Sequence, residues 1–454
     1  MTRQPVIINA PASKSLSHRT LIAAALAGGV SRISGALDSD DITRTRDCLA
    51  ACGAVIEEAD GALRVTGMAE GPRGGNADGK HKDEAPHELF MHEAGTTCRL
   101  MTAVAAAGRG TFRVHGAQRM QERPMAELTG ALAKLGAGFA FEGKKGFLPF
   151  VMTAGGFTGK KVDITLEESS QYLSGLLLAA PLADHEITIS VTGEKAVSWP
   201  YVALTLRIME DFKAGFAVQV RRGRAWEAAP WRSVKTATPG QIRFVVQPTG
   251  YGPADYRVEG DWSNASYFLA AGAVGDRPVL VKGLCADSLQ GDRAIMDILS
   301  QMGASINVNF DGILVTPSRL RGVRVDMGRC PDLVPTVAAA AAFASTPTII
   351  ENVAHLRIKE TDRLAACARE VAKTGAATEI GEDSLTIRPG RLRRGKSIDF
   401  SAYNDHRMAM SLSLFGLAGI DVNLDNTACV GKSFPGFWDE WDKIVPEDRD
   451  GSAA

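Results

Sequence analysis

The sequence has no long apolar run, no excess of either charge and few aromatic residues. Its longest apolar stretch, residues 337–344, is far shorter than the roughly 20 residues that cross a bilayer. Lys and Arg number 51 against 52 Asp and Glu, and aromatics make up 6% of the chain, so no basic surface for nucleic acid is indicated. The first residues lack a charged-then-apolar signal pattern. We therefore expect neither a membrane nor a nucleic acid as partner.

Cysteine is also scarce: the chain has seven, an odd and scattered set. This usage favours reduced thiols and a cytoplasmic location. Cys48 and Cys52 share a helix face, but no second pair or nearby histidine completes a metal site. We expect no bound metal.

The length of 454 residues exceeds what one compact core accommodates, so two domains are expected. An internal repeat supports this. Amphipathic helices end at a glycine, which we expect in the left-handed conformation, and alternating strands follow. The five glycines are Gly53, Gly136, Gly215, Gly303 and Gly375.

A second kind of helix, rich in Ala and other small residues, precedes each of these and is predicted to lie inside its domain. Each opens near Ser, Thr, Asp or Asn, which are expected to cap it. Together the patterns predict six α/β units, three before about residue 258 and three after it. Residues 70–88 are predicted to be a surface loop, and 221–241 an irregular hairpin or an insertion.

Polar residues gather at the starts of the small-residue helices, where free N–H groups favour an anion. They are Lys14, Ser15 and Arg19, then Gly95 and Thr96, then Ser169, Ser170 and Gln171, then Asp332, and finally His406 and Arg407. Capping alone would explain a Ser or Thr. It does not explain Lys14 and Arg19, because a cation at a helix N-terminus is unfavourable without an anion beside it.

Further cations stand at turns or element starts. Lys359, Glu360 and Arg363 are predicted to begin an amphipathic helix, with a carboxylate between two cations that suits proton transfer. Arg123 precedes a proline, a position where arginine is usually solvated, and Lys432 lies on a Gly-Lys-Ser turn. If these cations converge in a cleft between the domains, two phosphate-bearing molecules would neutralise them. Because unpaired cations repel one another, the empty cleft would stay open and close on ligands.

Eight motifs carry a resemblance to a known family. They are PASKSLSHR, AGTTCR, RMQERPM, SSQYLSGLLL, SWPYV, IKETDRLAA, NDHRMAM and GKSFPGF, in this order. The chain resembles the 5-enolpyruvylshikimate-3-phosphate (EPSP) synthases, the 3-phosphoshikimate 1-carboxyvinyltransferases, over roughly residues 5–440. The resemblance implies an α/β enolpyruvyl transferase fold in which each domain has three βαβαββ units around buried helices.

The implied domains are 13–258 and 1–12 with 259–454, with the active site in the cleft between them. The sixth unit lacks its own hairpin, and we expect the N-terminal strand QPVIINA to help complete it.

The implied reaction moves the enolpyruvyl group of phosphoenolpyruvate to the 5-hydroxyl of shikimate 3-phosphate and releases phosphate. It runs by addition and elimination without metal or cofactor, as a step of the shikimate pathway to aromatic amino acids. The residues implied for phosphoenolpyruvate are Lys14, Gly95, Arg123, Gln171, Arg363, Arg407 and Lys432. Those implied for shikimate 3-phosphate are Ser15, Arg19, Ser169, Ser170, Gln171, Ser198, Tyr201, Asp332, His355 and Lys359. Asp332 is our candidate base and Glu360 our candidate acid, with Lys14 stabilising the departing phosphate; these roles could exchange.

Three positions depart from the family pattern. Glu93 and Leu100 stand where asparagine and proline are common, and His355 replaces an asparagine expected to contact shikimate 3-phosphate. Two alternatives remain: a UDP-N-acetylglucosamine enolpyruvyl transferase, and a non-catalytic protein that binds a phosphate ligand. Residues 111–124 lack the cysteine common in the first, and a binding protein would not need Glu360 and Asp332. We expect a monomer.

Overall fold

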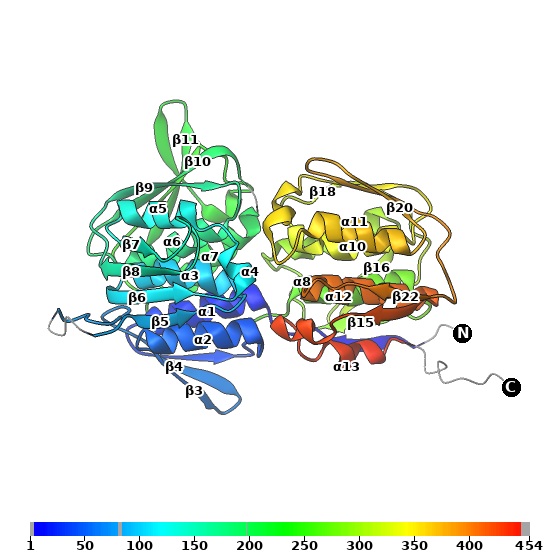
Figure 1. The fold of residues 1–454 in the computed structure, drawn as a ribbon, viewed down its shortest axis with the longest axis horizontal. Coiled ribbons are helices and arrows are strands. Elements are labelled where there is room, and N and C mark those ends of the chain that lie inside the picture. The colour runs from blue at the N-terminus through cyan, green and yellow to red at the C-terminus, as the bar shows by residue number, and fades with distance from the viewer. Residues whose placement is uncertain (1–3, 80–83, 197, 446–454) are drawn as a thin grey trace. The chain divides into compact units, whose positions relative to one another are not determined.

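The computed structural model describes residues 4–79, 84–196 and 198–445. The chain forms two compact units (Figure 1). Ser13–Val258 make up the N-terminal unit, and Met1–Ala12 with Glu259–Ala454 make up the C-terminal unit. Part of the predicted loop 70–88, residues 80–83, lies outside the described residues. None of the helices in the described ranges combines the length and apolar character that a bilayer crossing requires.

The N-terminal unit contains three repeats. The elements of the first are α1 (Lys14–Leu26), β2 (Val30–Ser34), α2 (Asp40–Ala51), β3 (Val55–Ala59) and β4 (Ala62–Thr66), with β14 (Asp255–Arg257). Those of the second are β5 (His87–Phe90), α3 (Gly95–Ala106), β6 (Arg109–His115), α4 (Gln118–Gln121), α5 (Ala126–Lys134), β7 (Gly138–Phe141) and β8 (Phe150–Gly155). Those of the third are β9 (Lys161–Leu166), α6 (Gln171–Ala179), β10 (Ile187–Ala196), α7 (Trp199–Asp211), β11 (Phe216–Arg222), β12 (Ala225–Ala229) and β13 (Ile242–Val246).

The C-terminal unit repeats the plan. Its first repeat has β1 (Val6–Asn9), α8 (Trp262–Val274), β15 (Val279–Lys282), α9 (Ile295–Gln301), β16 (Ser305–Asn309) and β17 (Gly312–Thr316). The second has β18 (Arg324–Asp326), α10 (Val334–Ala341), β19 (Thr348–Glu351), α11 (Arg363–Lys373), β20 (Ala377–Ile380) and β21 (Leu385–Arg388). The last has β22 (Ser397–Phe400), α12 (His406–Leu412), β23 (Asp421–Leu424) and α13 (Phe437–Asp442).

Each of the first five repeats builds one small mixed sheet in which the first two strands are parallel and a hairpin adds the others. The orders are β14-β2-β4-β3, β5-β6-β8-β7, β12-β11-β13-β10-β9, β1-β15-β17-β16 and β18-β19-β21-β20. Within the described part of the sixth repeat, up to residue 445, the strands are the parallel pair β22-β23 alone, so the prediction that this repeat lacks its own hairpin is confirmed. The stretch 221–241 contains β12, an extra edge strand that forms a hairpin with β11, so the predicted hairpin is present.

The N-terminal strand joins a different repeat from the one predicted. β1 pairs in parallel with β15, Val6 opposite Val279, and does not complete the sixth repeat. The reason is an exchange of first strands. β14, the strand directly before α8 in the chain, pairs with β2 instead, with Asp255 opposite Arg32. This leaves the edge of β15 for β1, so the chain starts in the C-terminal unit and enters the N-terminal unit at Ser13.

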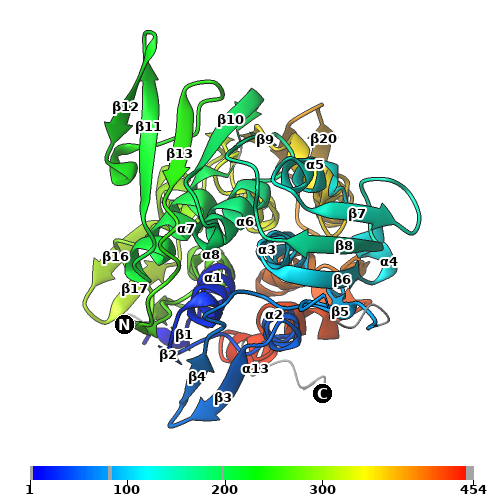
Figure 2. The same ribbon diagram turned by 90° about the vertical axis from the view of Figure 1, so that its left-hand side faces the viewer.

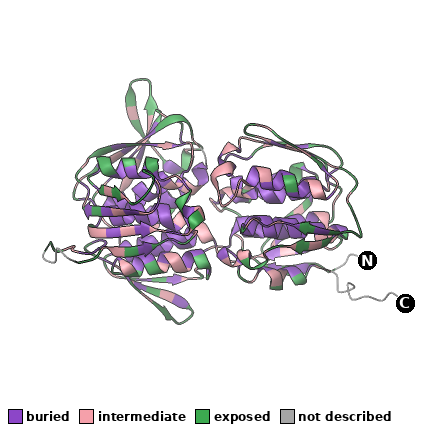
Figure 3. Ribbon diagram, viewed as in Figure 1, coloured by how far each residue is buried: buried purple, intermediate pink, exposed green. Residues whose placement is uncertain are grey.

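The small-residue helices are buried, as predicted. In α1 every residue from Leu16 to Leu26 is buried, and α8 is buried from Trp262 to Ala273. Figure 3 shows these helices in purple inside each unit, and Figure 2 shows the sheets of the N-terminal unit around α1, α3 and α6. Small side chains let the helices approach one another closely, as where the backbone of Arg99 in α3 lies 2.9 Å from the position of a Cβ on Gly175 in α6.

The glycine prediction holds for four of the five helix ends. Gly53, Gly136, Gly303 and Gly375 have φ of +111°, +114°, +98° and +107°. Gly215 does not, because α7 ends earlier and Lys213 takes the left-handed conformation with φ +63°. At Gly215 the constraint is space, since a Cβ would lie 2.9 Å from Cγ2 of Thr249.

The predicted caps are partly correct. Ser13, Asp261 and Asp405 accept hydrogen bonds from backbone N–H groups of α1, α8 and α12. Helix α3 instead begins after Ala94, whose side chain offers no cap, and Asp332 lies in a 3-10 turn before α10. Polar side chains at these two helix starts are therefore not explained by capping.

Candidate active site

Lys14, the first residue of α1, lies against the carboxylate of Asp41 in the first turn of α2. A network of buried hydroxyl groups contacts the backbone of Asp41. Thr97 Oγ1 lies 2.8 Å from Thr45 Oγ1, and both hydroxyls contact the backbone carbonyl of Asp41. His18 completes it, with Nδ1 2.7 Å from Thr45 Oγ1. The arrangement holds the Lys14 ammonium at a helix N-terminus, where Asp41 offsets the unfavourable helix dipole.

His18 should make the fold acid-sensitive. Burial, helped by the positive charge of Lys14, lowers the pKa of His18 from 6.5 to about 3. The unfolded chain binds a proton near pH 6.5 and the native state does not, so stability is lost as pH falls from 6.5 toward 3. Between pH 7 and pH 5 the wild type should lose about 2 kcal/mol more unfolding free energy than His18→Gln. Urea unfolding at both pH values measures this, with His185→Gln as the control. Equal losses in wild type and His18→Gln would contradict the buried neutral imidazole.

Arg19 is a fully buried cation, and its partners among the described residues are neutral groups. Its guanidinium donates to Thr205 Oγ1 at 2.8 Å, to the Ser15 carbonyl at 2.8 Å and to Ser174 Oγ at 3.3 Å. It also donates to the Tyr201 carbonyl at 3.2 Å, and so joins α1, α6 and α7. Burial lowers the pKa of Arg19 to about 10. Because hydroxyls and carbonyls do not neutralise a buried charge, this position favours an anion.

Gly95 opens α3 beneath two arginine side chains. A Cβ at this position would lie 2.5 Å from Arg123 Nη1 and 2.7 Å from Arg99 Nη1. Arg123 is buried, which corrects the expectation that an arginine on this turn is solvated. Arg99 donates to Gln171 Oε1 at 3.3 Å, and Gln171 Nε2 donates to Thr96 Oγ1 at 2.8 Å. The starts of α3 and α6 thus present one polar surface containing Arg99, Arg123 and Gln171.

Three serines lie at the starts of α6 and α7. Ser169 Oγ accepts from the Gln171 N–H at 3.2 Å, and Ser170 precedes the first residue of α6. Ser198 is buried with φ +57°, a left-handed conformation that is uncommon for serine. Such a conformation is held only where the surroundings determine it, and it is frequent at ligand sites.

In the C-terminal unit Arg363 is surrounded by carboxylates. Its guanidinium donates to Asp405 through Nε at 2.7 Å, to Asp332 through Nη1 at 2.9 Å and to Glu360 through Nη2 at 2.8 Å. Arg363 and Asp405 are both fully buried. Asp362 caps α11 and so places Arg363 in its first turn, while Asp405 caps α12. The capped starts of two helices therefore fix this cluster.

Arg407 and Lys432 extend the cluster on either side. Arg407 donates to Asp332 Oδ2 at 3.0 Å and to Ser263 Oγ of α8. Lys432 Nζ lies 3.9 Å from Glu360 Oε1. Asp332 and Glu360 are thus each held by two cations: Arg363 contacts both, Arg407 contacts Asp332, and Lys432 contacts Glu360.

These cations keep Asp332 ionised. Burial alone would raise its pKa, but the charges of Arg407 and Arg363 outweigh burial and hold the pKa of Asp332 well below its ordinary value. Burial lowers the pKa of Arg363, but the negative charges of Asp405, Glu360 and Asp332 outweigh burial and raise this pKa above its ordinary value. A carboxylate in this state is a weak base, so its strength as a base depends on what else the two arginines bind.

The described residues contain no group of three or more His, Cys, Asp or Glu side chains placed to hold a metal ion.

Comparison with known proteins gives a full-length match. The family model for EPSP synthase (3-phosphoshikimate 1-carboxyvinyltransferase) matches residues 2–441. The chain belongs to this family. Curated relatives named 3-phosphoshikimate 1-carboxyvinyltransferase include one from Marinomonas sp. (strain MWYL1), 39% identical over 440 residues that cover 96% of each chain. One from Haemophilus influenzae is 38% identical over 442 residues, again with 96% of each chain covered.

Solved structures of EPSP synthases share the fold. EPSP synthase from Acinetobacter baumannii superposes with a TM-score of 0.72 at 24% identity, covering 97% of this chain and 95% of that one. The enolpyruvyl transferase NikO from Streptomyces tendae has a TM-score of 0.70 at 18% identity, covering 98% and 95%. The family and the enolpyruvyl transferase fold predicted from the eight motifs are thereby confirmed.

The structure corrects two expectations about the cations of this EPSP synthase family member. Lys359 and Glu360 do not begin the helix, because α11 starts at Arg363 after its Asp362 cap. Four of the seven cations are also not unpaired, since Lys14, Arg363, Arg407 and Lys432 contact carboxylates of their own unit.

Sequence reasoning missed the carboxylates that hold these cations. Asp41 and Asp405 carry no signal beyond their places in a helix's first turn and at a cap, and Asp405 lies inside the NDHRMAM motif without a predicted role. Arg99 likewise lies inside AGTTCR. His355 is buried in a 3-10 helix, Ala354–Ile358, close in sequence to Lys359 and Glu360.

A methyl group on Gly95 should displace Arg123 without unfolding the chain, because side-chain ends can move. We expect Gly95→Ala to raise KM for phosphoenolpyruvate by roughly tenfold or more, the loss of about one charge-assisted contact. KM for shikimate 3-phosphate should change little. Steady-state kinetics measure both. Gly130→Ala is the control, since its Cβ meets nothing within 4 Å. If Gly95→Ala leaves the KM for phosphoenolpyruvate unchanged, Arg123 does not bind phosphoenolpyruvate.

Proposed function

We infer that the two groups of residues described above carry out the EPSP synthase reaction. In it the 5-hydroxyl of shikimate 3-phosphate adds to C2 of phosphoenolpyruvate while C3 takes up a proton. Loss of phosphate from C2 and of a proton from C3 then gives the enolpyruvyl ether. The reaction needs cations for phosphate and carboxylate groups and at least one proton donor and acceptor.

The polar surface of the N-terminal unit suits shikimate 3-phosphate. We assign it to Ser15, Arg19, Ser169, Ser170, Gln171, Ser198 and Tyr201, together with Asp332, His355 and Lys359 of the C-terminal unit. Arg19 is the main support for this assignment, because a phosphate would stabilise a buried guanidinium whose other partners are neutral. Phosphoenolpyruvate is assigned to Lys14, Gly95, Arg123 and Gln171 with Arg363, Arg407 and Lys432. Each set draws residues from both units, so we propose that both substrates bind between the units.

The network of Asp332, Arg363 and Arg407 is the observation that supports a mechanism. Arg363 and Arg407 both donate to Asp332. When the carboxylate or phosphate of phosphoenolpyruvate accepts these donors instead, Asp332 loses the charges that hold its pKa low. Its basicity then rises at the moment when the 5-hydroxyl must be deprotonated. Substrate binding and activation of the base are thereby coupled.

Glu360 is our candidate for proton transfer at C3. It lies between Arg363 at 2.8 Å and Lys432 at 3.9 Å, both assigned to the same substrate. It would give its proton to C3 during addition and take one back during elimination. Lys14 and Lys432 would stabilise the departing phosphate, each with a carboxylate partner already in place, Asp41 and Glu360.

The test is phosphate release from phosphoenolpyruvate by the purified full chain, with and without shikimate 3-phosphate. We expect release only when both are present and none with UDP-N-acetylglucosamine as acceptor. Release with UDP-N-acetylglucosamine alone would contradict the acceptor. Binding of both substrates without release would leave the non-catalytic alternative. The seven cysteines, all free thiols, support a cytoplasmic setting, and we expect a monomer.

A further inference from the structure

A short basic loop of the C-terminal unit joins β21 to β22 and takes no part in the site above. Residues 391–396 read RLRRGK, with exposed side chains on Arg391, Arg393, Arg394 and Lys396. The loop is anchored at two points by backbone hydrogen bonds, from Arg393 to the Thr374 carbonyl at 3.0 Å and from Gly395 to the Gly419 carbonyl at 2.7 Å. Its cations are therefore presented from a fixed backbone.

Among the residues that the structure describes, no ion pair is formed by Arg391, Arg393, Arg394 or Lys396. The nearby arginines differ, since Arg388 donates to Glu379 at 2.8 Å and Arg324 pairs with Glu351. Asp421, next to the loop, is engaged by Ser397 Oγ at 2.9 Å. Four like charges on six residues repel one another, and a bound anion would relieve this repulsion.

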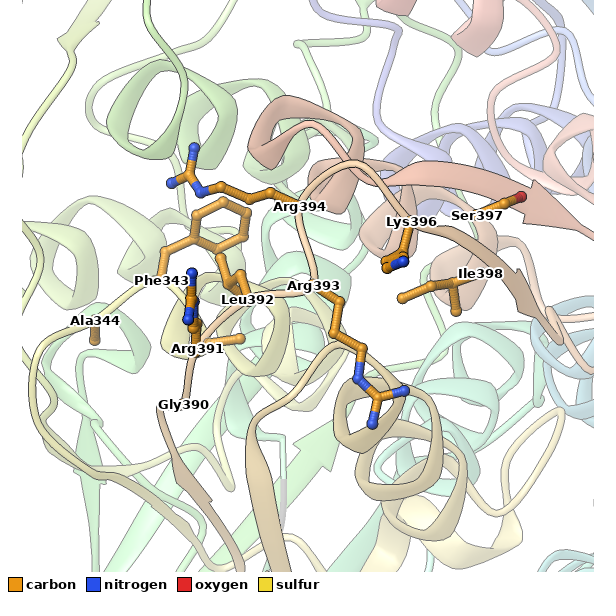
Figure 4. Close-up of a pocket in the computed structure, with 11 residues that line it drawn as sticks. Phe343, Ala344, Gly390, Arg391, Leu392, Arg393, Arg394, Lys396, Ser397 and Ile398 are labelled. Atoms are coloured by element: carbon orange, nitrogen blue, oxygen red, sulfur yellow. The ribbon is translucent and has the colours of Figure 1, made fainter.

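The loop also lines a concave surface. A pocket of about 880 Å³ is bounded by residues 390–394 and 396–398 of the loop and by Ala342, Phe343 and Ala344 at the end of α10. In Figure 4 Arg394 extends toward Phe343, whereas Arg393 extends away from it. Phe343 and Leu392 are half-buried, and Phe343 stacks on Phe415 with ring centroids 5.7 Å apart. The pocket thus combines an apolar wall with a cationic rim, at a size typical of small-molecule sites.

The end of α10 does not account for these charges. A helix C-terminus favours one nearby cation by about 0.3–1 kcal/mol. Here two of the last carbonyls of the helix are already satisfied, because the backbone N–H groups of Phe343 and Ala344 donate to the carbonyls of Ala340 and Ala341. A single lysine or arginine would satisfy the remaining dipole, so the other cations need a different explanation.

We propose that this pocket is a second anion site, separate from the catalytic residues, that binds a small organic polyanion with an apolar body, of the nucleoside polyphosphate class. Arginine forks match phosphate oxygens in pairs, and Phe343 and Leu392 provide a surface for the apolar part. The concave shape favours a small molecule over a nucleic acid, which would need a longer basic surface.

The test is calorimetric titration of ATP, without magnesium, into the full chain. Arg391→Gln/Arg394→Gln should bind ATP roughly tenfold or more weakly, because two charge-assisted contacts are lost. Arg388→Gln, the matched control whose arginine already has a partner, should bind as the wild type does. Tripolyphosphate should bind about fivefold more weakly than ATP, because it lacks the apolar part.

Several results would overturn the proposal. They are no ATP binding at low salt, equal binding by Arg391→Gln/Arg394→Gln and wild type, equal affinity for ATP and tripolyphosphate, and loss of ATP binding in Lys14→Ala alone. The last would assign the ATP to the catalytic residues. A short DNA duplex that binds more tightly than ATP would assign the loop to nucleic acid and also overturn it. Thermal melting of each variant confirms that these exposed substitutions leave the fold intact.

Discussion

Replacing Glu360 by glutamine is expected to lower kcat by roughly 10²–10⁴-fold, the usual contribution of a positioned general acid or base. The amide keeps an oxygen that can accept from Arg363, now at 2.8 Å, so the local structure should persist. The KM values of both substrates should change much less than kcat, because Glu360 acts on a proton at C3 and is not assigned to either substrate's charged groups. Steady-state phosphate release measures both parameters.

A second measurement separates proton transfer from a structural role. Reversible protonation at C3 carries deuterium from D₂O into phosphoenolpyruvate, and this exchange should fall with kcat in Glu360→Gln. The matched control is Glu379→Gln, which changes an exposed carboxylate of the same unit that pairs with Arg388. Exchange at the wild-type rate in Glu360→Gln would move the acid role to Asp332 or Lys14.

Removing the Asp405 carboxylate should produce the largest loss of stability. Asp405 is fully buried and accepts from Arg363 at 2.7 and 3.2 Å and from the Arg407 N–H at 3.0 Å. In Asp405→Ala a buried guanidinium loses its main partner, which costs about 3–5 kcal/mol. Denaturant unfolding measures this loss. KM for phosphoenolpyruvate should rise as well, because Asp405 orients Arg363.

The control isolates the helix cap from the ion pair. Asp362 caps α11 through the Ala365 N–H at 3.0 Å and also accepts from the partly exposed Arg357 at 3.4 Å, a pair that contributes little, so Asp362→Ala should cost only about 1 kcal/mol. Similar losses in Asp405→Ala and Asp362→Ala would mean that Asp405 acts as a cap alone. In that case Arg363 is held sufficiently by Asp332 and Glu360.

The repeat shows how far local pattern predicts a fold. Two kinds of feature depend only on neighbours within a few residues: the glycines at helix ends, and the Ala-rich helices with the alternating strands that follow them. The predictions of these features were correct for most repeats. The prediction for Gly215 was wrong because two residues share the roles expected of that glycine. Lys213 adopts the left-handed conformation, and Gly215 is needed because a side chain would not fit beside Thr249. The placement of β1 was wrong because its partner, β15, lies some 270 residues away along the chain.

The sequence by itself determined the family, the order of the motifs and the residue types that surround the substrates, since these are written in short contiguous stretches. Only the tertiary structure decided which carboxylate neutralises which cation, because Lys14 and Asp41, or Arg363 and Asp405, meet through helix packing. Ion pairing depends on distance in space, and its energy falls with separation and with solvent. Neither quantity can be obtained from spacing along the chain.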